Sequence, residues 1–255
     1  MSVAIFIPAR LDSKRLPKKL IQLIGKKTLI SHVVDRALET GIETVVVATD
    51  SVEIMNIFSN NEKVKCVMTS KEHPTGSDRI YEALSKIDPK KKIQTIINLQ
   101  GDLPLINPKL INDLVKASEN SEADVVTLAY PIGQHQIGKA GNEDVTKVAT
   151  SFYDEDNRFG KALYFSRQPI PHNASTYYEH IGIYSYTREA LEKFVNLESS
   201  PLEKLEKLEQ LRILENNMKI DVLISDISTV NVDTEEGLEL ARKEYAEKHS
   251  TKEMA

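Results

Sequence analysis

Short apolar runs alternate with amphipathic segments through the first half of the chain. The apolar runs have the length and continuity of strands that are buried on both faces, and they cover residues 3–7, 45–48, 64–68, 95–99 and 125–129. The segments between them space their apolar residues as helices do, over residues 28–40, 52–59, 78–87 and 108–118. Strand and helix in alternation predict an α/β fold, a doubly wound and mostly parallel sheet with helices on both faces.

The pattern changes in the second half. Residues 133–142 are rich in Gly, Gln and His and predict a mobile loop. Further strands are predicted over residues 145–153, 162–166, 178–186 and 220–224, the first two as an antiparallel pair. Helices are predicted over residues 202–216 and 235–249. With no repeat or linker in view, we expect one domain over residues 1–255, whose later part is a mixed α/β lobe.

Composition narrows the class of protein. The chain has 255 residues, 40% of them hydrophobic, which is enough for a buried core, and its net charge of −5 argues against nucleic acid as a partner. Cys66 is the single cysteine, so no disulfide forms within the chain and a reducing compartment is expected. No apolar stretch approaches the ~20 residues that span a membrane, and the first apolar run lacks a basic leader. We therefore expect a cytoplasmic protein without membrane insertion.

A basic loop follows the first predicted strand. It carries Arg10, Lys14, Arg15, Lys18 and Lys19 in a protein whose overall charge is negative. In a doubly wound sheet, ligands bind beyond the carboxyl ends of the strands, so these cations are placed to hold an anion. The alternative is a solvated surface loop. The loop is not a Walker motif, because Leu20 stands where the first glycine would be, and the chain has no G-x-G-x-x-G for a dinucleotide.

Three further groups follow predicted strands. Thr75, Gly76 and Ser77 offer hydroxyls and backbone amides that suit a base edge or a phosphate, although ordinary N-capping by Ser77 explains them as well. Asp102 and Asp233 each follow a strand, and together they could hold Mg²⁺ against a triphosphate, with helix capping as the alternative. Transfer at phosphorus needs no protein nucleophile, because positioning and charge neutralisation drive it.

The motifs together resemble the 3-deoxy-manno-octulosonate cytidylyltransferases, also called CMP-Kdo synthetases. The segments that carry the resemblance occur in the family's order over nearly the whole chain: residues 7–10, 15–19, 47–50, 73–79, 98–102, 164–171, 180–184, 208–212 and 232–234. The resemblance implies a nucleotide-sugar transferase type of sheet and a second lobe at about residues 161–223 that binds sugar and builds a homodimer. It also implies the synthesis of CMP-Kdo and pyrophosphate from CTP and Kdo for lipopolysaccharide.

The resemblance also implies residue roles. The CTP-binding residues would be Pro8, Ala9, Arg10, Arg15, Lys19, Thr75, Gly76, Ser77 and Arg79. The sugar-binding residues would be Gln100, Arg167, His180, Tyr184 and Glu209, with the fork of Arg167 suited to the sugar carboxylate. The Mg²⁺ ligands would be Asp102 and Asp233, and the catalytic group would be these two with Arg10 and Lys19. His180 has an alternative as a structural histidine in a strand.

Three departures from the family pattern are visible. Lys18, Lys19 and Leu20 stand where the family often has Gly-Lys-Pro, Leu103 stands where Glu usually follows Gln-Gly-Asp, and the segment 133–144 matches poorly. These leave two alternatives among enzymes, a cytidylyltransferase for 8-amino-Kdo or for sialic acid. From another class, an inactive nucleotide-binding scaffold is a further alternative, which the intact Arg10, Lys19, Asp102 and Asp233 argue against.

Overall fold

The computed structural model describes residues 2–13, 15–133 and 137–253, and it divides the chain into two compact units. The first unit comprises the described residues of 1–94, 98–111 and 229–255, and the second comprises those of 95–97 and 112–228. The range 161–223, predicted as the second lobe, lies inside the second unit. In the described part of the chain, no helix is both long and apolar enough to cross a membrane.

Parallel strands form the centre of the first unit. They are β1 (Val3–Ala9), β4 (Thr44–Thr49) and β5 (Lys65–Met68), in the order β5-β4-β1. The register places Ala4 beside Thr44 and Val46 beside Lys65. Strand β6 (Thr95–Leu99) is divided, since its residues 98 and 99 belong to the first unit and the others to the second. Because β1, β4 and β6 are buried nearly throughout, their continuous apolar runs are explained, and the predicted parallel strands are confirmed.

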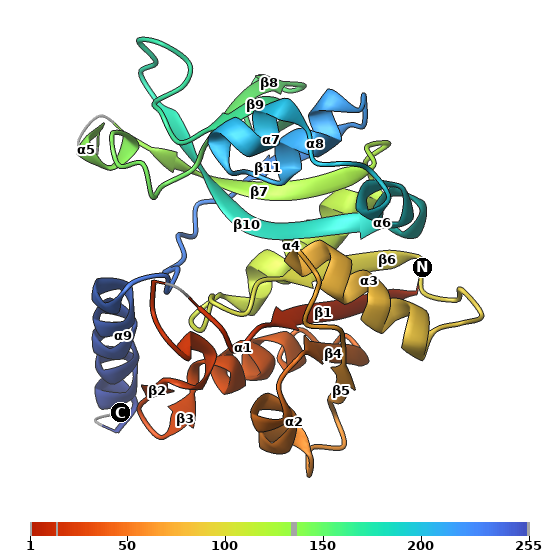
Figure 1. The fold of residues 1–255 in the computed structure, drawn as a ribbon. Coiled ribbons are helices and arrows are strands. Elements are labelled where there is room, and N and C mark those ends of the chain that lie inside the picture. The colour runs from red at the N-terminus through yellow and green to blue at the C-terminus, as the bar shows by residue number, and fades with distance from the viewer. Residues whose placement is uncertain (1, 14, 134–136, 254–255) are drawn as a thin grey trace. The chain divides into compact units, whose positions relative to one another are not determined.

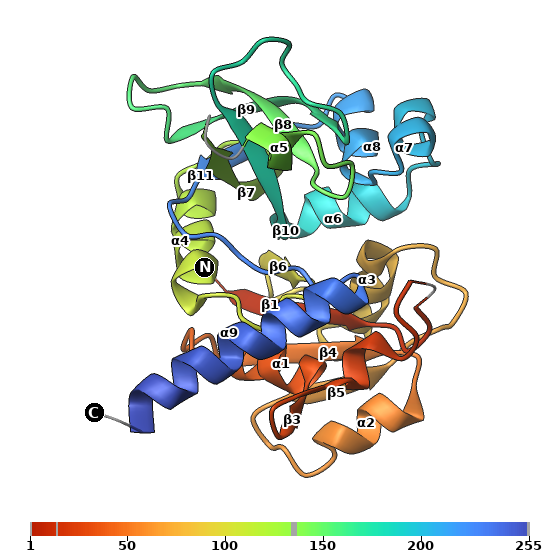
Figure 2. The same ribbon diagram turned by 90° about the vertical axis from the view of Figure 1, so that its left-hand side faces the viewer.

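Helices cover both faces of these parallel strands, as Figures 1 and 2 show. Helix α3 (Gly76–Ile87) covers one face, while α1 (Leu29–Leu38) and α2 (Val52–Phe58) cover the other. Each begins at a hydroxyl side chain that accepts a backbone N–H: Thr28 for α1, Ser51 for α2 and Thr75 for α3. The doubly wound arrangement predicted from the sequence is thereby confirmed for this unit.

The remaining elements of the first unit come from the early part of the chain and from its C-terminal part. They are the 3₁₀ turn η1 (Lys19–Ile21), the hairpin of β2 (Leu23–Ile24) and β3 (Lys27–Thr28), and helix α9 (Glu235–Glu253). Figure 1 shows α9 beside the hairpin, and Arg242 of this helix donates to the carbonyl of Leu23 at 3.0 Å. Helix α4 (Pro108–Glu119) starts at the predicted proline, and its residues are shared between the two units.

The second unit holds a mixed sheet. Its strands are β7 (Val125–Ile132), β8 (Lys147–Phe152), β9 (Phe159–Ser166), β10 (Tyr177–Thr187) and β11 (Ile220–Ile224), in the order β10-β7-β11-β9-β8. Strand β11 runs parallel to β7, whereas β10–β7, β11–β9 and β8–β9 are antiparallel. The sheet curls, so that β8 also pairs with β10 where Lys147 faces Glu179. The predicted strands of this half, including the antiparallel pair, are confirmed.

The helix predicted over residues 202–216 is wrong as one element. The structure has two short helices, α7 (Pro201–Glu206) and α8 (Gln210–Glu215), and Lys207 between them is left-handed with φ 57°. Arg212 of α8 is buried and donates to the carboxylate of Glu203 at 2.9 and 2.6 Å, which folds α8 back against α7. Lys207 ends α7 in the left-handed conformation, and this break lets Arg212 pair with Glu203.

Two helices lie where none was predicted. Helix α6 (Arg188–Val195) begins at Thr187, whose hydroxyl accepts the N–H of Ala190 at 3.1 Å. Helix α5 (Ile137–Ala140) falls inside the segment predicted as a mobile loop, of which residues 134–136 lie outside the described residues. Ala140 packs in a small apolar cluster with Ile132 and Tyr177, which anchors this part of the segment to the sheet. Helix α5 has four residues and is too short to show a period, whereas α6 does space Ala190, Leu191 and Phe194 as a helix does, and the sequence reasoning missed it.

Candidate active site

Opposite charges meet where β1 and β6 end. The ammonium of Lys19, in η1, lies 2.9 Å from Oδ2 of Asp102 and 2.7 Å from Oδ1 of Asp233. The second oxygen of Asp233 accepts Nη2 of Arg15 at 2.8 Å. The N–H of Val232 donates to the carbonyl of Asp102 at 3.0 Å, which holds the two aspartate segments side by side. The structure therefore brings together the two predicted metal ligands and two of the predicted triphosphate-binding cations.

This cluster shifts the ionisation of its members. Burial disfavours the charge of Lys19, but Asp102 and Asp233 outweigh it and raise its pKa. Burial would also raise the pKa of Asp233, yet Lys19 and Arg15 lower that pKa below the ordinary aspartate value. At neutral pH the carboxylate of Asp233 is thus ionised, and it is held by cations that an incoming ligand would have to share.

Two glycines let the backbone segments approach closely around Pro8. A Cβ on Gly101 would come within 3.0 Å of the carbonyl oxygen of Pro8, and a Cβ on Gly76 would come within 3.2 Å of its ring. The cleft beside them has a volume of about 300 Å³. Its lining includes the predicted residues Pro8, Arg10, Arg15, Lys19, Gln100, Asp102 and Asp233. Ala9 is buried at the end of β1.

The start of α3 lies beside the same loop. Thr75 is the N-cap, and it forms a capping box with Asp78, so the interpretation of Ser77 as the cap is wrong. Ser77 lies instead in the first turn and is fully buried. The guanidinium of Arg10 donates to the carbonyl of His73 at 2.6 Å, just before this turn. The basic loop and the segment at residues 73–79 are therefore joined directly.

Arg79 faces inward. Its guanidinium, 1% exposed, donates to Oδ2 of Asp50 and to Oγ1 of Thr69, both at 2.7 Å. Burial lowers the pKa of Arg79, while Asp50 opposes that effect. The ion pair ties α3 to the ends of β4 and β5. Its assignment to CTP binding stays a prediction, since the described contacts of the guanidinium are all internal to the protein.

In the second unit, the predicted sugar-binding aromatic groups lie together on β10. The rings of His180 and Tyr184 are 5.3 Å apart, and that of His180 also meets the Phe165 ring edge-on at 5.0 Å. Nε2 of His180 lies 3.0 Å from Oγ1 of Thr127. Burial lowers the pKa of His180 to about 3 and raises that of Tyr184 well above its ordinary value. Both side chains are therefore neutral at physiological pH and suited to hydrogen bonding.

Arg167 follows β9 and is held by backbone carbonyls. Its Nε donates to the carbonyl of Glu206 at 3.1 Å and its Nη1 to the carbonyl of Glu143 at 2.9 Å. The carboxylate of Glu206 accepts the backbone N–H of Arg167 at 3.1 Å. Glu209 is partly buried just before α8, and its charge contributes to the raised pKa of Tyr184. Three of the four sugar residues of this unit, His180, Tyr184 and Glu209, thus share one neighbourhood.

The sequence reasoning missed two residues that organise these sites, Asp50 and Glu206. Asp50 directly follows a buried strand, so the rule that located Asp102 could also have found it. Glu206 accepts Oγ of Ser166 at 2.8 Å as well as the N–H of Arg167, and no sequence signal distinguishes it from the other charged residues of its helix. The segment 47–50 contributed to the resemblance without a role for its aspartate.

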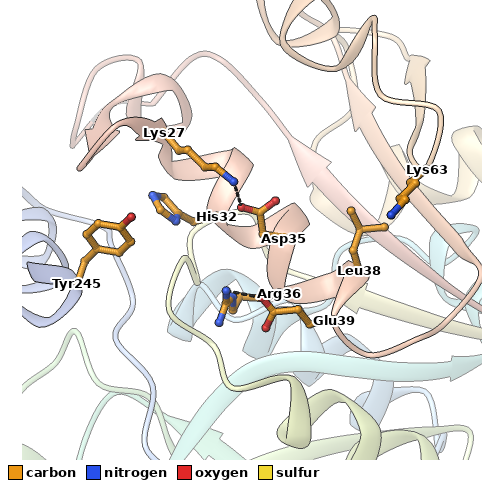
Figure 3. Close-up of a pocket in the computed structure, with 8 residues that line it drawn as sticks. All are labelled: Lys27, His32, Asp35, Arg36, Leu38, Glu39, Lys63 and Tyr245. Atoms are coloured by element: carbon orange, nitrogen blue, oxygen red, sulfur yellow. Dashed lines mark hydrogen bonds and ion pairs between the residues drawn. The ribbon is translucent and has the colours of Figure 1, made fainter. Parts of the chain in front are cut away.

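A hollow of about 500 Å³ lies elsewhere on the first unit (Figure 3). Helix α1 supplies most of its wall, and Tyr245 of α9 closes one side, where its ring meets that of His32 at 4.9 Å. The charged side chains here pair among themselves, Lys27 with Asp35 at 2.6 Å and Arg36 with Glu39 at 2.5 Å. The hollow contains none of the predicted site residues, so these pairs serve as controls for the predictions below.

The fold and the charged cluster define a nucleotidyltransferase, and comparison with known proteins agrees. A family model described as "Cytidylyltransferase" matches residues 4–220. A solved CMP:2-keto-3-deoxy-manno-octonic acid synthetase complexed with CTP superposes with a TM-score of 0.87 at 33% identity, covering 97% of this chain and 100% of that one. A putative glucose-1-phosphate thymidylyltransferase from Bacillus anthracis shares the fold alone, with a TM-score of 0.65 at 14% identity.

Curated relatives identify the family more narrowly. The 3-deoxy-manno-octulosonate cytidylyltransferase of Bartonella henselae is 44% identical over 239 residues, covering 94% of this chain and 96% of the relative. That of Azorhizobium caulinodans is 45% identical over 240 residues, covering 94% of each chain. The chain belongs to the 3-deoxy-manno-octulosonate cytidylyltransferase family. The family resemblance, the α/β nucleotidyltransferase fold and the enzyme class expected from the sequence are confirmed.

Proposed function

We propose that this protein transfers CMP from CTP to Kdo and releases pyrophosphate. The observation that carries the proposal is Lys19, whose ammonium bridges Asp102 and Asp233 at a strand end, the edge of a doubly wound sheet where ligands bind. In the reaction, the anomeric hydroxyl of Kdo attacks the α-phosphorus, and the bond to the β-phosphate breaks. The hydroxyl loses its proton and pyrophosphate leaves. The use of CTP would place the reaction in the cytoplasm.

The first unit would bind the nucleotide. Arg15 and Lys19 are placed to draw the triphosphate into the cleft, because both line it and both carry charge at neutral pH. The segment of Thr75, Gly76 and Ser77 at the start of α3 would contact the cytidine. Charge neutralisation of the phosphates by basic side chains lowers the barrier to substitution, so no protein nucleophile is required.

The single cysteine, Cys66, has no part in this chemistry. Burial raises the pKa of its thiol to about 11, which suits a structural cysteine.

Asp102 and Asp233 would hold Mg²⁺. Both already bind one cation, the ammonium of Lys19, so their oxygens face a common point that suits a metal ion. In the part of the chain that the structure describes, no group of three or more His, Cys, Asp or Glu side chains could hold a metal. Two carboxylates completed by phosphate oxygens and water are the usual arrangement for Mg²⁺. The ion would supply charge stabilisation at the transferred phosphate.

The second unit would bind the acceptor sugar. Arg167 would hold the carboxylate of Kdo with its planar fork. The neutral side chains of His180 and Tyr184, with Glu209, would bind hydroxyls. A polar site of this kind rejects analogues, because each missing hydroxyl leaves a buried group unpaired at ~1–3 kcal/mol. Kdo is therefore the expected acceptor, with sialic acid a poor one.

A panel of acceptors tests the proposal. Purified protein, CTP and Mg²⁺ are combined in parallel with Kdo, 8-amino-Kdo or sialic acid, and pyrophosphate release is measured. We expect the highest kcat/KM with Kdo. A preference for sialic acid would contradict the proposed substrate, and a preference for 8-amino-Kdo would show that the divergent segment at 133–144 has changed the far end of the sugar site. Absence of turnover with every acceptor would favour the inactive scaffold, which the family membership disfavours.

A further inference from the structure

A lysine is completely buried in the second unit. Lys147, the first residue of β8, is 0% exposed and is one of the largest fully buried side chains of the protein. Lysine is almost never fully buried unless its charge is compensated, because moving an ammonium from water into the protein is costly. Burial lowers the pKa of Lys147, and the neighbouring guanidinium of Arg167 adds to this effect. The burial of this charged side chain therefore needs an explanation other than the filling of space in the core.

Three carbonyl oxygens surround the ammonium. It donates to the carbonyl of Asn142 at 2.9 Å, to that of Val145 at 2.5 Å, and to that of Arg167. Lysine has three N–H donors, so these bonds use all of them. The carbonyls come from two segments of chain, the turn at residues 142–145 and the end of β9. The ammonium therefore joins these segments, with the carbonyl dipoles replacing water around its charge.

The same turn also holds the side chain of Arg167. Nη1 of Arg167 donates to the carbonyl of Glu143 at 2.9 Å, and the N–H of His180 donates to the carbonyl of Thr146 at 2.8 Å. The segment of residues 142–146 thus contacts Lys147, the guanidinium of Arg167 and the backbone of His180. Removing the ammonium would break its three hydrogen bonds and so weaken the connection between this segment and the chain after β9.

We propose that Lys147 is a positioning residue for the acceptor: it locks the turn at 142–145 to Arg167, so that the guanidinium is presented to the carboxylate of the sugar. This inference rests on the proposed function, in which Arg167 binds that carboxylate. Lys147 acts through Arg167 and does not touch the substrate. Its positive charge, held by carbonyls, also adds to the field that attracts an anionic acceptor.

Two substitutions test the role. Lys147→Met keeps the length of the side chain but removes every donor, and Lys147→Gln keeps two N–H donors without the charge. We expect Lys147→Met to raise KM for Kdo roughly 10-fold or more, since small misplacements of a positioning group have effects of this size, while KM for CTP stays within about 2-fold. Lys147→Gln should lie between Lys147→Met and the wild type. Tyr153→Phe is the matched control, because it removes a hydrogen bond to Asp221 of 2.8 Å in the same unit.

A double-mutant cycle separates positioning from general stability. If Lys147 acts through Arg167, Lys147→Met should have little further effect on KM for Kdo in an Arg167→Ala background. Equal increases in KM for both substrates, or an additive effect in the double variant, would overturn the proposal. Loss of the native fold in both Lys147 variants would also overturn it, in favour of a role in the fold alone. Wild-type protein that releases no pyrophosphate from CTP and Kdo would reject the proposed function first, and the assignment of Lys147 with it.

Discussion

The ammonium of Lys19 lies 2.7 Å from a carboxylate oxygen of Asp233, although 214 positions separate the two residues in the chain. The same ammonium reaches Asp102, so one side chain contacts both of the carboxylates proposed as metal ligands. Because a divalent cation would take the same oxygens, Lys19 would have to share or yield its position when Mg²⁺ and CTP bind. The predictions that follow begin with this cluster.

We expect Asp102→Asn and Asp233→Asn each to fold but to lose most of the turnover. Each change removes a charged ligand, which should cost several kcal/mol of transition-state stabilisation, or at least ~100-fold in kcat. Pyrophosphate release across a Mg²⁺ titration measures the effect. Asp35→Asn is the control, because Asp35 pairs with Lys27 in the hollow of Figure 3, away from the cleft. Near wild-type turnover in either site variant would remove that residue from the metal site.

Lys19→Ala should weaken the use of CTP more than the use of the sugar. Its ammonium is a point charge in the cleft that would contact the triphosphate. Steady-state kinetics with each substrate varied in turn distinguish the two, with Lys27→Ala as a control. An increase confined to KM for the sugar would contradict the assignment.

Glu82 should make the protein sensitive to acid. Burial opposes its ionisation, but Lys86, the N–H of Ser70 and His73 lower its pKa to about 2. A carboxyl group whose pKa is depressed in the folded state stabilises the protein above the unfolded value of ~4.3, and this stabilisation is lost as the pH falls toward the folded pKa. Since Glu82 is a quarter exposed, we expect Glu82→Gln to lower the free energy of unfolding by about 1 kcal/mol at pH 7. The difference in free energy of unfolding between the variant and the wild type should vanish near pH 2 in denaturant titrations. A difference that stays the same at every pH would refute the prediction.

Lys18 should be better replaced by glycine than by alanine. It adopts the left-handed conformation, with φ 53°, at the position where the family often has glycine. This conformation costs a non-glycine residue about 1 kcal/mol, so Lys18→Gly should be more stable than Lys18→Ala by about that amount. Both variants lose the exposed ion pair with Glu53 at 3.4 Å, so their comparison isolates the backbone. Equal denaturation midpoints would show that no strain is present at Lys18.

The second unit should build a two-fold homodimer. Leu163 on β9 is 56% exposed, and large apolar side chains that lie exposed are commonly covered in assemblies. Light scattering at micromolar protein should give twice the monomer mass, and Leu163→Glu should reduce it. Leu240→Glu on α9 is the control, since Leu240 is 49% exposed in the first unit. A monomer mass for the wild type would contradict the prediction.

Much of this protein followed from local patterns in the sequence. The apolar runs located the buried strands, and the rule that ligands gather at the carboxyl ends of parallel strands selected Asp102 and the basic loop. Lys18 takes the left-handed conformation at a position where the family often has glycine. These features depend on neighbours in the chain or on a regular property of sheets, so they could be anticipated.

Other features arose only in the tertiary structure, because they pair groups that lie far apart in the chain. Arg79 could be assigned to CTP on motif grounds, yet its partner Asp50 lies 29 positions away and draws it inward. The break at Lys207 brings Arg212 to Glu203, and local propensity indicated neither the break nor the ion pair. Lys147 is buried because carbonyls from two segments converge on it, and a lysine at the start of a strand gives no sign of this in the sequence. Burial and long-range electrostatics decide such pairings, and local propensity does not record them.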